Sequence, residues 1–470
     1  MMAEHVKLER SSDTRTGSQM KHFVVASAIA ALFSVGCTGS PDSADAGTSA
    51  DASNAGDGGA SDDAGFDANG LDDASGRDAA ADVDTGPTDP DFTPTPRPGR
   101  HDVEIVDTRQ IVPSPGIPTE ATIQTANNNL DVVRFQGRVY LVWRTAPSHF
   151  ASDQTTMHVV SSTDEVDWDY ETSYQTGRDL REPRFLPVGD QLFLYMAQLG
   201  TDPNAFEPGE EHYVVRAADG TWSDALISMN KEDYILWRSK RLDSMAYLLG
   251  YVGGSAVFTD EAPIKVEFMT TDDGVQWDPI NPARRYILEG GVLETDFAFG
   301  EDGTLYGVSR NESGDEEGFG MKVCKAPASD ITDWSCHPDP KKYDSPLMFS
   351  YDGEAYLIGR RNVTPSGNFD LGRTDLSMHD QFLWNQLEYI RHRKRCSIWR
   401  YDQDTDEIVF MADLPSRGDT CFAGLLKGDT DGEFVVYDYS SPLDGPDYTW
   451  RHGQLNETRI YRTVIRFTRR

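Results

Sequence analysis

The sequence predicts an all-β fold, a six-bladed β-propeller whose blades are four-stranded antiparallel sheets. Three observations predict it: short β-branched and aromatic runs between turns, their recurrence near every fifty residues, and a repeated closing turn. The first unit extends from Leu130 to Trp168 and contains apolar runs at 132–135, 139–143 and 157–160. One such meander cannot bury both of its faces, so several copies must pack together.

An aromatic residue shortly after a turn marks the expected second strand of each unit. The equivalent positions are Tyr140, Phe193, Tyr247, Tyr306, Tyr356 and, in a weaker copy, Val435. The successive spacings between them are 53, 54, 59, 50 and 79 residues. A period near fifty with about four strands per unit is typical of propeller blades, which gives six blades here.

The closing turn and the two ends of the domain support the same fold. The turn 162–168, Ser-x-Asp-x-Val-x-Trp, recurs at 271–277 as Thr-x-Asp-x-Val-x-Trp, with looser copies at 219–222 and 332–334. We interpret Trp168 and Trp277 as blade core. Apolar runs at 103–106 and 110–112 predict a strand that pairs with 459–467, which closes the ring and protects a sheet edge.

Residues 1–37 have the features of an export signal. Lys21 and His22 precede an apolar stretch, Phe23 to Phe33, which is too short to span a bilayer. The stretch ends in Ser-Val-Gly-Cys at 34–37 and resembles a bacterial lipoprotein signal, which implies lipidation of Cys37 and an outer-membrane or cell-surface location. A plain secretory signal is the alternative. Met20 is a second candidate start because it gives a signal of normal length.

Residues 38–100 are almost entirely Asp, Ala, Gly, Ser, Thr and Pro, without a lysine. Such a segment buries too little apolar surface to offset its ordering entropy, so we expect a disordered tether before a propeller at 101–470. A metal-binding segment is the alternative, but the Asp-x-Asp-x-Asp-Gly spacing of a calcium loop is missing. We therefore predict no metal and no cofactor.

The formal net charge of −35 argues against a nucleic-acid partner, which requires a basic surface. We expect a monomer whose partners are a glycan and, through the lipid, a membrane. The basic run at 391–395 is the exception to the acidic composition. We interpret it as a solvated edge, with contact to an anionic glycan or lipopolysaccharide as the alternative.

Four cysteines follow Cys37, and they allow three disulfide pairings that the sequence alone does not distinguish. Cys324 and Cys336 fall on adjacent strands of one expected blade, so we favour that pair and Cys396 with Cys421. An exported protein permits both bridges. Their spacing is not that of a zinc site.

Arginine recurs at the ends of the expected inner strands, which meet at the mouth of a propeller. The set is Arg144, Arg181, Arg238, Arg310, Arg360 and Arg361. Guanidinium groups bind carboxylate or sulfate in a bidentate fashion, so several around one pocket indicate an anion site. In particular, we expect Arg144, Arg181 and Arg360 to converge on one anion. The alternative is that each holds blades together by pairing with a carboxylate such as Glu182, Glu294 or Asp296.

The acids expected at the same level are Asp153, Glu182, Glu294, Asp296 and Asp419, and Glu182 is a candidate substrate ligand. They suit glycoside hydrolysis, which needs an acid and a nucleophile or base on either side of the bond. Asp153, in a polar loop, is the expected acid, and Glu294, on an inner strand, is the expected base. His149 is a candidate hydroxyl ligand or base. Trp237 beside Arg238 is a candidate platform for a sugar ring.

These segments resemble the sialidase-like propellers, and the closing turns resemble shortened Asp boxes (BNR repeats). The resemblance is strongest to bacterial exported proteins of the exo-alpha-sialidase-like type and covers 127–461. The matching segments are 143–149, 179–183, 236–238, 291–294, 358–360, 418–420 and 439–441. In sialidases it implies an arginine triad for the sialic carboxylate, a Tyr–Glu nucleophile pair and an Asp acid. Tyr437 and Tyr439 are the candidate nucleophiles, and Asp419 and Thr420 are candidate substrate ligands.

The sequence therefore predicts a surface-tethered propeller that acts on glycans as an exo-glycoside hydrolase of acidic sugars. A non-catalytic carbohydrate- or protein-binding lipoprotein is the alternative, since a propeller fold alone implies no chemistry.

Overall fold

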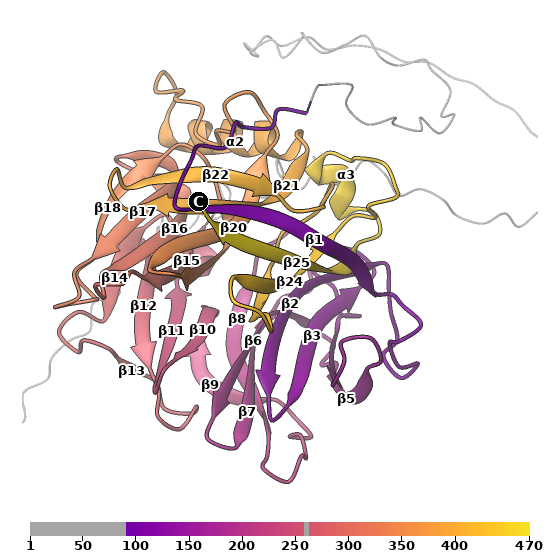
Figure 1. The fold of residues 1–470 in the computed structure, drawn as a ribbon. Coiled ribbons are helices and arrows are strands. Elements are labelled where there is room, and N and C mark those ends of the chain that lie inside the picture. The colour runs from indigo at the N-terminus through magenta and orange to yellow at the C-terminus, as the bar shows by residue number, and fades with distance from the viewer. Residues whose placement is uncertain (1–90, 258–262) are drawn as a thin grey trace, which may run out of the picture. The chain divides into compact units, whose positions relative to one another are not determined.

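The computed structural model describes residues 91–257 and 263–470 as a six-bladed β-propeller (Figure 1). The predicted signal, Cys37 and the tether up to residue 90 lie outside the described residues. Five blades are four-stranded antiparallel sheets, and the third carries a fifth strand. The predicted fold class is confirmed for the propeller itself.

The first three blades follow one another along the chain. Blade 1 contains β2 (Ala126–Phe135), β3 (Arg138–Ala146), β4 (Thr156–Ser162) and β5 (Asp169–Tyr174). Blade 2 contains β6 (Asp179–Val188), β7 (Gln191–Leu199), β8 (Pro208–Arg216) and β9 (Ile227–Glu232). Blade 3 contains β10 (Tyr234–Leu242), β11 (Met245–Val252), β12 (Ile264–Thr270) and β13 (Asp278–Pro279), and β14 (Tyr286–Gly290) also pairs with β12.

The remaining blades complete the ring. Blade 4 contains β15 (Val292–Phe299), β16 (Leu305–Asp315), β17 (Gly318–Ala326) and β18 (Ser335–Asp339). Blade 5 contains β19 (Asp344–Tyr351), β20 (Glu354–Asn362), β21 (Lys394–Asp402) and β22 (Glu407–Asp413). Blade 6 contains β23 (Gly424–Lys427), β24 (Glu433–Ser440), β25 (Arg459–Arg469) and β1 (His101–Val112).

The positions that marked the repeat all lie on the second strand of a blade. They are Tyr140 on β3, Phe193 on β7, Tyr247 on β11, Tyr306 on β16, Tyr356 on β20 and Val435 on β24. The aromatic side chains pack between neighbouring blades. Tyr356, for example, contacts Phe467 of blade 6 at a ring distance of 4.6 Å. Each buried large apolar side chain contributes about 1.5–3 kcal/mol, so the repeat marks where the blades bind one another.

The ring closes by pairing the two ends of the domain, as predicted. β1 runs antiparallel to β25, from His101 opposite Arg469 to Val112 opposite Ile460. In Figure 1 the indigo strand β1 lies along β25. This pairing covers an edge that otherwise exposes unpaired backbone groups.

The closing turns have one hydrogen-bond pattern. Asp164 Oδ1 accepts from the amides of Val166 (2.8 Å) and Asp167 (3.0 Å). Asp273 Oδ1 accepts from Val275 and Gln276, both at 2.8 Å. The aspartate therefore fixes the turn between the third and fourth strands, and these backbone bonds lower its pKa in both copies.

Within residues 91–257 and 263–470, three helical segments interrupt the strands, and the periodicity of the sequence did not predict them. η1 (Gly254–Ala256) follows β11, α2 (Met378–Ile390) connects β20 to β21, and α3 (Trp450–Gln454) connects β24 to β25. Ser377 and Thr449 cap the N-termini of α2 and α3 by accepting backbone hydrogen bonds. Among the described residues, no helix is both long and apolar enough to cross a membrane.

Two predictions at the surface of blade 5 differ from the structure. Residues 91–100, assigned to the tether, contact the blade: Arg361 donates to the carbonyl of Phe92 (2.7 Å), and Arg395 pairs with Asp91 (2.9 Å). The basic run was expected to be solvated, but Arg393, Lys394 and Arg395 are buried. That expectation was wrong because Asp447 pairs with both arginines, and backbone carbonyls surround the Lys394 ammonium.

Candidate functional site

The inner strands lose their regular pairing at one level of the ring. The register shifts lie between residues 128 and 130 of β2, 181 and 184 of β6, 236 and 238 of β10, 292 and 295 of β15, and 344 and 347 of β19. Asn129, Glu182 and Ser345 have φ angles of 41°, 53° and 54° at these shifts. Bulges of this kind re-aim side chains next to active sites, and all three residues line a pocket here.

The pocket has a volume of about 190 Å³ and lies where the inner strands meet. Its polar lining consists of Asn129, His149, Arg181, Glu182, Glu294, Arg310, Glu312, Ser345, Arg360, Tyr439 and Gln454. Phe206, Tyr251, Val257, Leu293, Phe422 and Trp450 complete it. A larger cavity of about 640 Å³ lies between residues 92–97 and the outer strands of blades 4 and 5, and Arg361 is the one predicted site residue in its lining. Arg361 pairs there with Asp413 (2.6 Å) and does not line the central pocket, contrary to expectation. The central pocket is therefore the candidate functional site.

Arg181 enters the pocket from β6 in blade 2. Its Nε donates to Asp179 (2.5 Å) and its Nη2 donates to the carbonyl of His149 (2.6 Å). Burial would lower the pKa of Arg181, but Asp179 outweighs burial and raises it. The guanidinium is thus a fixed cation at the wall, with 14% of its side chain exposed.

Arg310 and Arg360 enter from blades 4 and 5. Arg310 pairs with Glu294 (2.6 Å) and Glu312 (2.5 Å), and Arg360 pairs with Asp344 (3.2 Å). Burial would lower both arginine pKa values, but the surrounding anionic groups raise them. Together with Arg181 they place three permanent cations around one small pocket.

Arg144 does not line this pocket, contrary to the expected convergence of Arg144, Arg181 and Arg360. Its side chain is fully buried, donates to Asp179 (2.9 Å) and holds the carbonyls of Ser148 and Phe150. Burial lowers its pKa to about 10. Arg144 therefore fixes the loop that carries His149, and Arg310 takes the third position at the pocket.

Trp237 and Arg238 are also outside the pocket lining. Trp237 is 1% exposed and packs against the Phe422 ring at 5.4 Å, so it offers no face to a sugar. Arg238 is buried and donates to the carbonyl of Pro346 (2.6 Å). The bulge in β10 turns both residues into the centre of the ring. Trp450 of α3 lines the pocket instead, with the Arg360 guanidinium 4.8 Å from its ring.

Three carboxyl groups line the pocket: Glu182 of blade 2, and Glu294 and Glu312 of blade 4. Glu294 accepts from Arg310 and from the amide of Ser345 (2.7 Å). Glu182 accepts from Asn129 Nδ2 (3.1 Å), and burial raises its pKa to about 7. Asp153, the expected acid, is exposed in its loop and does not line the pocket. Glu182 and Glu294 thus have contrasting surroundings.

Asp419 organises the side of the pocket formed by blade 6. Its buried carboxylate accepts from Tyr439 Oη (3.0 Å) and Trp450 Nε1 (3.0 Å), and contacts His149 Nδ1 (2.7 Å). Burial would raise the pKa of Asp419, but His149 and Arg360 lower it. Burial lowers the pKa of His149 and raises that of Tyr439. A carboxylate therefore holds a neutral phenol and an imidazole at the wall.

Tyr437, the other candidate nucleophile, lies elsewhere. Its hydroxyl donates to Glu165 (2.8 Å), which also pairs with Arg462 of β25 (2.5 Å). Side chains alternate along a strand, so Tyr437 and Tyr439 share a face, but the Tyr437 hydroxyl lies at the junction with blade 1. Among the two tyrosines, only Tyr439 lines the pocket.

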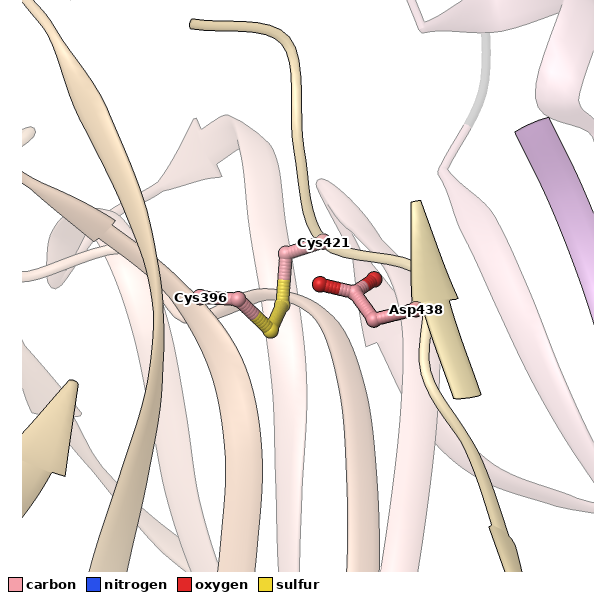
Figure 2. Close-up of side chains that lie close together, drawn as sticks. All are labelled: Cys396, Cys421 and Asp438. Atoms are coloured by element: carbon pink, nitrogen blue, oxygen red, sulfur yellow. A yellow bond between two sulfur atoms is a disulfide. The ribbon is translucent and has the colours of Figure 1, made fainter. Parts of the chain in front are cut away.

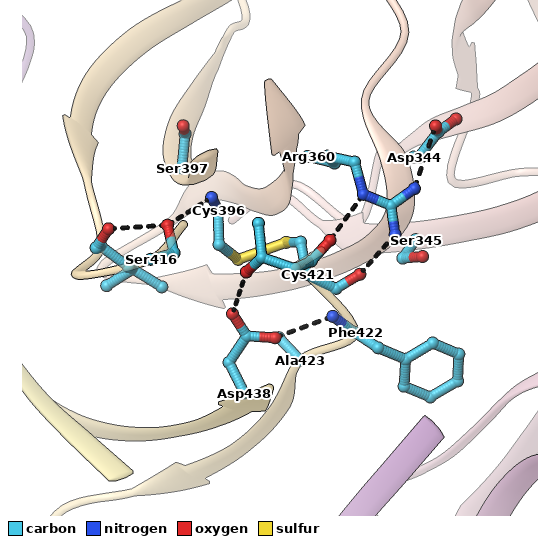
Figure 3. The surroundings of a disulfide bond; sticks show 12 residues. Asp344, Ser345, Arg360, Cys396, Ser397, Ser416, Cys421, Phe422, Ala423 and Asp438 are labelled. Atoms are coloured by element: carbon cyan, nitrogen blue, oxygen red, sulfur yellow. Dashed lines mark hydrogen bonds and ion pairs between the residues drawn. A yellow bond between two sulfur atoms is a disulfide. The ribbon is translucent and has the colours of Figure 1, made fainter. Parts of the chain in front are cut away.

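Both expected disulfides are present: Cys324 with Cys336, and Cys396 with Cys421. Figure 3 shows the second bridge beside Arg360, which lines the pocket. Arg360 donates to the carbonyls of Thr420 (2.5 Å) and Cys421 (3.3 Å), so the bridge anchors the backbone that orients this arginine. Thr420 itself is buried, and its hydroxyl donates to the carbonyl of Tyr439 (2.8 Å).

Asp438 lies beside the same disulfide (Figure 2). Its carboxyl accepts from the amide of Phe422 (2.8 Å), and burial raises its pKa to about 7. Asp438, Cys396 and Cys421 place possible metal-ligand atoms within 4.8 Å of one another. The two sulfur atoms are bonded to each other, however, and a disulfide lacks the thiolates that bind metals.

Sequence reasoning missed several residues of the site. Asn129 and Ser345 come from bulges, and Trp450 comes from a helix inserted between two strands of blade 6. Arg184 is fully buried, and its guanidinium lies 4.4 Å from the ring of Phe422, which lines the pocket. The segment 179–184 contains two arginines and two acids, a density of charge that was the signal for Arg184.

Fold and site together define a six-bladed propeller with a central pocket lined by arginines, carboxyl groups and two tyrosines, Tyr251 and Tyr439. Neither a protein-family model nor a curated protein matches the chain. It is similar in structure to a protein of unknown function from Dyadobacter fermentans, with 11% identity and a TM-score of 0.50 over 78% of this chain and 99% of that one.

Other similar structures include Trypanosoma rangeli sialidase, with 11% identity and a TM-score of 0.48 over 74% of this chain and 56% of that one. The endosialidase of phage phi92 gives 9% identity and a TM-score of 0.48 over 79% and 70%. Identities this low show a shared fold alone. The chemistry must be argued from the pocket.

Proposed function

We propose that this protein is a glycan-active propeller, an exo-acting glycoside hydrolase that removes an acidic sugar. The observation that carries the proposal is the convergence of Arg181, Arg310 and Arg360, from three different blades, on one pocket that also contains carboxyl groups. The blades are arranged around one axis, so arginines from three of them can contact a small ligand from different sides. A pocket of about 190 Å³ suits a single terminal sugar better than the interior of a chain.

The arginines support recognition of a carboxylate on the sugar. Arg181 and Arg310 keep 14% and 16% of their side chains exposed, while protein carboxylates and carbonyls fix their remaining donors. A guanidinium held in this way offers its outer edge without losing rotamer entropy on binding. The charge-assisted bonds to a ligand carboxylate would be stronger than those to a neutral hydroxyl.

Tyr439 and Asp419 support a covalent mechanism. The buried phenol has a raised pKa and is therefore a weak nucleophile unless a neighbouring base accepts its proton. Asp419 accepts a hydrogen bond from that hydroxyl at 3.0 Å and has a lowered pKa, so it is available as the base. In this role Asp419 takes the place of the glutamate that the sialidase resemblance implies.

The proposal includes display at the cell surface. The signal-like segment ending at Cys37 and the acidic, Pro-containing segment after it support an anchored protein with a spacer. Residues 91–100 pack on blade 5, so the spacer would end at that blade.

Turnover by the purified protein lacking Cys37 tests the proposal, with sialosides and a panel of neutral and acidic glycans as substrates. We expect release of a terminal acidic sugar and weaker activity on the matching neutral sugar. Binding without turnover on every substrate would instead support a non-catalytic, carbohydrate-binding propeller. The absence of both binding and turnover would contradict a glycan function.

A further inference from the structure

One pocket carboxyl group differs from the others in its bonding. Both oxygens of Glu294 accept hydrogen bonds, from Arg310 and from Ser345, and both oxygens of Glu312 are bonded as well. In Glu182, Oε1 accepts from Asn129, whereas Oε2 is shielded from solvent and has no partner among the described residues. Glu182 is thus the lining carboxyl group with an oxygen available to a ligand.

The backbone conformation at Glu182 is unfavourable in free energy. Its φ of 53° lies in the left-handed region, which a non-glycine residue occupies at about 1–3 kcal/mol and most often at functional sites. The bulge between Arg181 and Arg184 creates this conformation and aims the side chain at the pocket. A regular strand would direct position 182 differently.

The surroundings of Glu182 favour its protonated form near neutral pH. Burial is the largest cause of its raised pKa, and the negative charge of Glu294 adds to it, while Arg184 and Arg181 oppose it. The other charged or titratable groups around it are Arg144, Glu211 and Tyr251. Within the described chain, Glu182 forms no ion pair that would keep it as a carboxylate. A carboxyl oxygen that lacks a hydrogen-bond partner in such a place can carry a proton. It then forms its missing hydrogen bond by donating that proton to an oxygen of a ligand.

We infer that Glu182 is the general acid and base of the hydrolysis, an inference that rests on the proposed function. In the first step Tyr439 Oη bonds to the anomeric carbon and its proton passes to Asp419. The bond from that carbon to the leaving oxygen breaks, its electron pair stays on that oxygen, and Glu182 supplies the proton that makes the leaving alcohol.

In the second step the Glu182 carboxylate takes a proton from water as the water oxygen bonds to the anomeric carbon. The bond to Tyr439 Oη breaks, its electron pair stays on the phenol oxygen, and Asp419 returns the proton. Glu182 and Asp419 recover their starting forms, and the net change is the addition of one water across the glycosidic bond.

The dependence of turnover on the leaving group tests this role in Glu182→Gln. We expect kcat on sialyllactose, whose leaving alcohol needs a proton, to fall by about 100-fold or more. Turnover of the 4-methylumbelliferyl sialoside, whose leaving group needs little help, should fall by less than about tenfold. Wild-type activity should decline as the pH rises through about 7, and the variant should lose that decline. Glu301→Gln, on an exposed turn, is the matched control and should match wild type in all three measurements.

Two results would overturn the inference while leaving the proposed function standing. One is an equal loss on both substrates with an unchanged pH profile, which would make Glu182 a positioning residue. The other is the leaving-group dependence in Asp153→Asn instead of Glu182→Gln. A wild-type protein that cleaves neither sialoside nor any acidic glycan of the panel overturns the proposed function and, with it, this assignment. ¹³C NMR of the Glu182 carboxyl, assigned with Glu182→Gln, should give a titration midpoint near 7, and a midpoint below about 5 rejects the acid in either case.

Discussion

Replacement of Arg181 by lysine tests whether Arg181 binds the ligand or only joins parts of the fold. Lysine keeps the positive charge but not the planar fork that bonds Asp179 at 2.5 Å and the His149 carbonyl at 2.6 Å. Its single ammonium can still pair with Asp179, so the main loss within the protein is the bond to the His149 carbonyl. One such bond contributes about 0.5–1.5 kcal/mol to folding, so we expect Arg181→Lys to remain folded with a small drop in melting temperature.

The loss of ligand binding should be larger than the loss of stability. Arg181 presents its outer edge to the pocket, and lysine cannot form a bidentate contact with a ligand carboxylate. We expect affinity or turnover for an acidic sugar to fall at least about tenfold, which corresponds to about 1.4 kcal/mol. Calorimetric titration with the sugar and thermal melting measure the two effects on the same preparation.

Arg178→Lys is the matched control, because Arg178 is exposed on the same blade, donates to the Leu199 carbonyl and does not line the pocket. It should bind and melt like the wild type. If Arg181→Lys unfolds the protein while the remaining folded fraction binds normally, Arg181 is a strut for the His149 loop. The anion site would then have to be built from other residues.

Four further predictions concern the tyrosines of β24, Asp438 and the two disulfides. Tyr439→Phe should abolish turnover while sugar binding persists, whereas Tyr437→Phe, which loses a bond to Glu165, should lower the melting temperature and spare turnover; equal effects on turnover would contradict the assignment of Tyr439. For Asp438, a pKa raised from 3.8 to about 7 means that the folded state binds the proton more tightly, so its stabilising contribution is complete below pH 3.8 and lost as the pH rises through 7. The shift corresponds to at most about 4 kcal/mol, so melting from pH 4 to 8 should show a smaller decline in Asp438→Asn than in wild type, and parallel curves would reject it. Thiol titration of the denatured, non-reduced mature chain should find no free thiol from the four bridged cysteines, and two or more reactive thiols per chain would be incompatible with both bridges. Replacing Cys396 and Cys421 by serine should cost about 2–4 kcal/mol of stability.

The local pattern of the sequence was enough to predict the architecture of this protein. The spacing of residues such as Tyr140 and Tyr356 records where one blade packs on the next, and that contact is repeated with every blade. The pairing of the two ends of the propeller domain was equally predictable. The last blade lacks one strand, and both ends of the domain carry a strand pattern. These features depend on short-range periodicity, which a sequence displays directly.

The composition of the pocket was only partly predictable. Arg181 and Glu294 were recognised because the inner strands, here β6 and β15, meet at the mouth. Arg360 was also recognised, although it lies on β20, the second strand of its blade. Arg144 was expected beside them, but it lies on β3, where Asp179 and the carbonyls of Ser148 and Phe150 accept its hydrogen bonds. The bulge at Glu182 was not predictable either, and it shifts the register by one residue and so changes the face.

The tertiary structure also decided which of the candidate groups line the pocket. Trp237 is a residue type suited to stacking on a sugar, and Tyr437 is one suited to act as a nucleophile. Packing instead places Trp237 against Phe422 and the Tyr437 hydroxyl at the junction with blade 1. Glu182 became the candidate acid because burial and an unpartnered oxygen alter its protonation, and neither property is written in the residue type. Sequence supplied the ring and the set of candidate side chains, and the three-dimensional arrangement selected among them because desolvation and direction depend on neighbours distant in the chain.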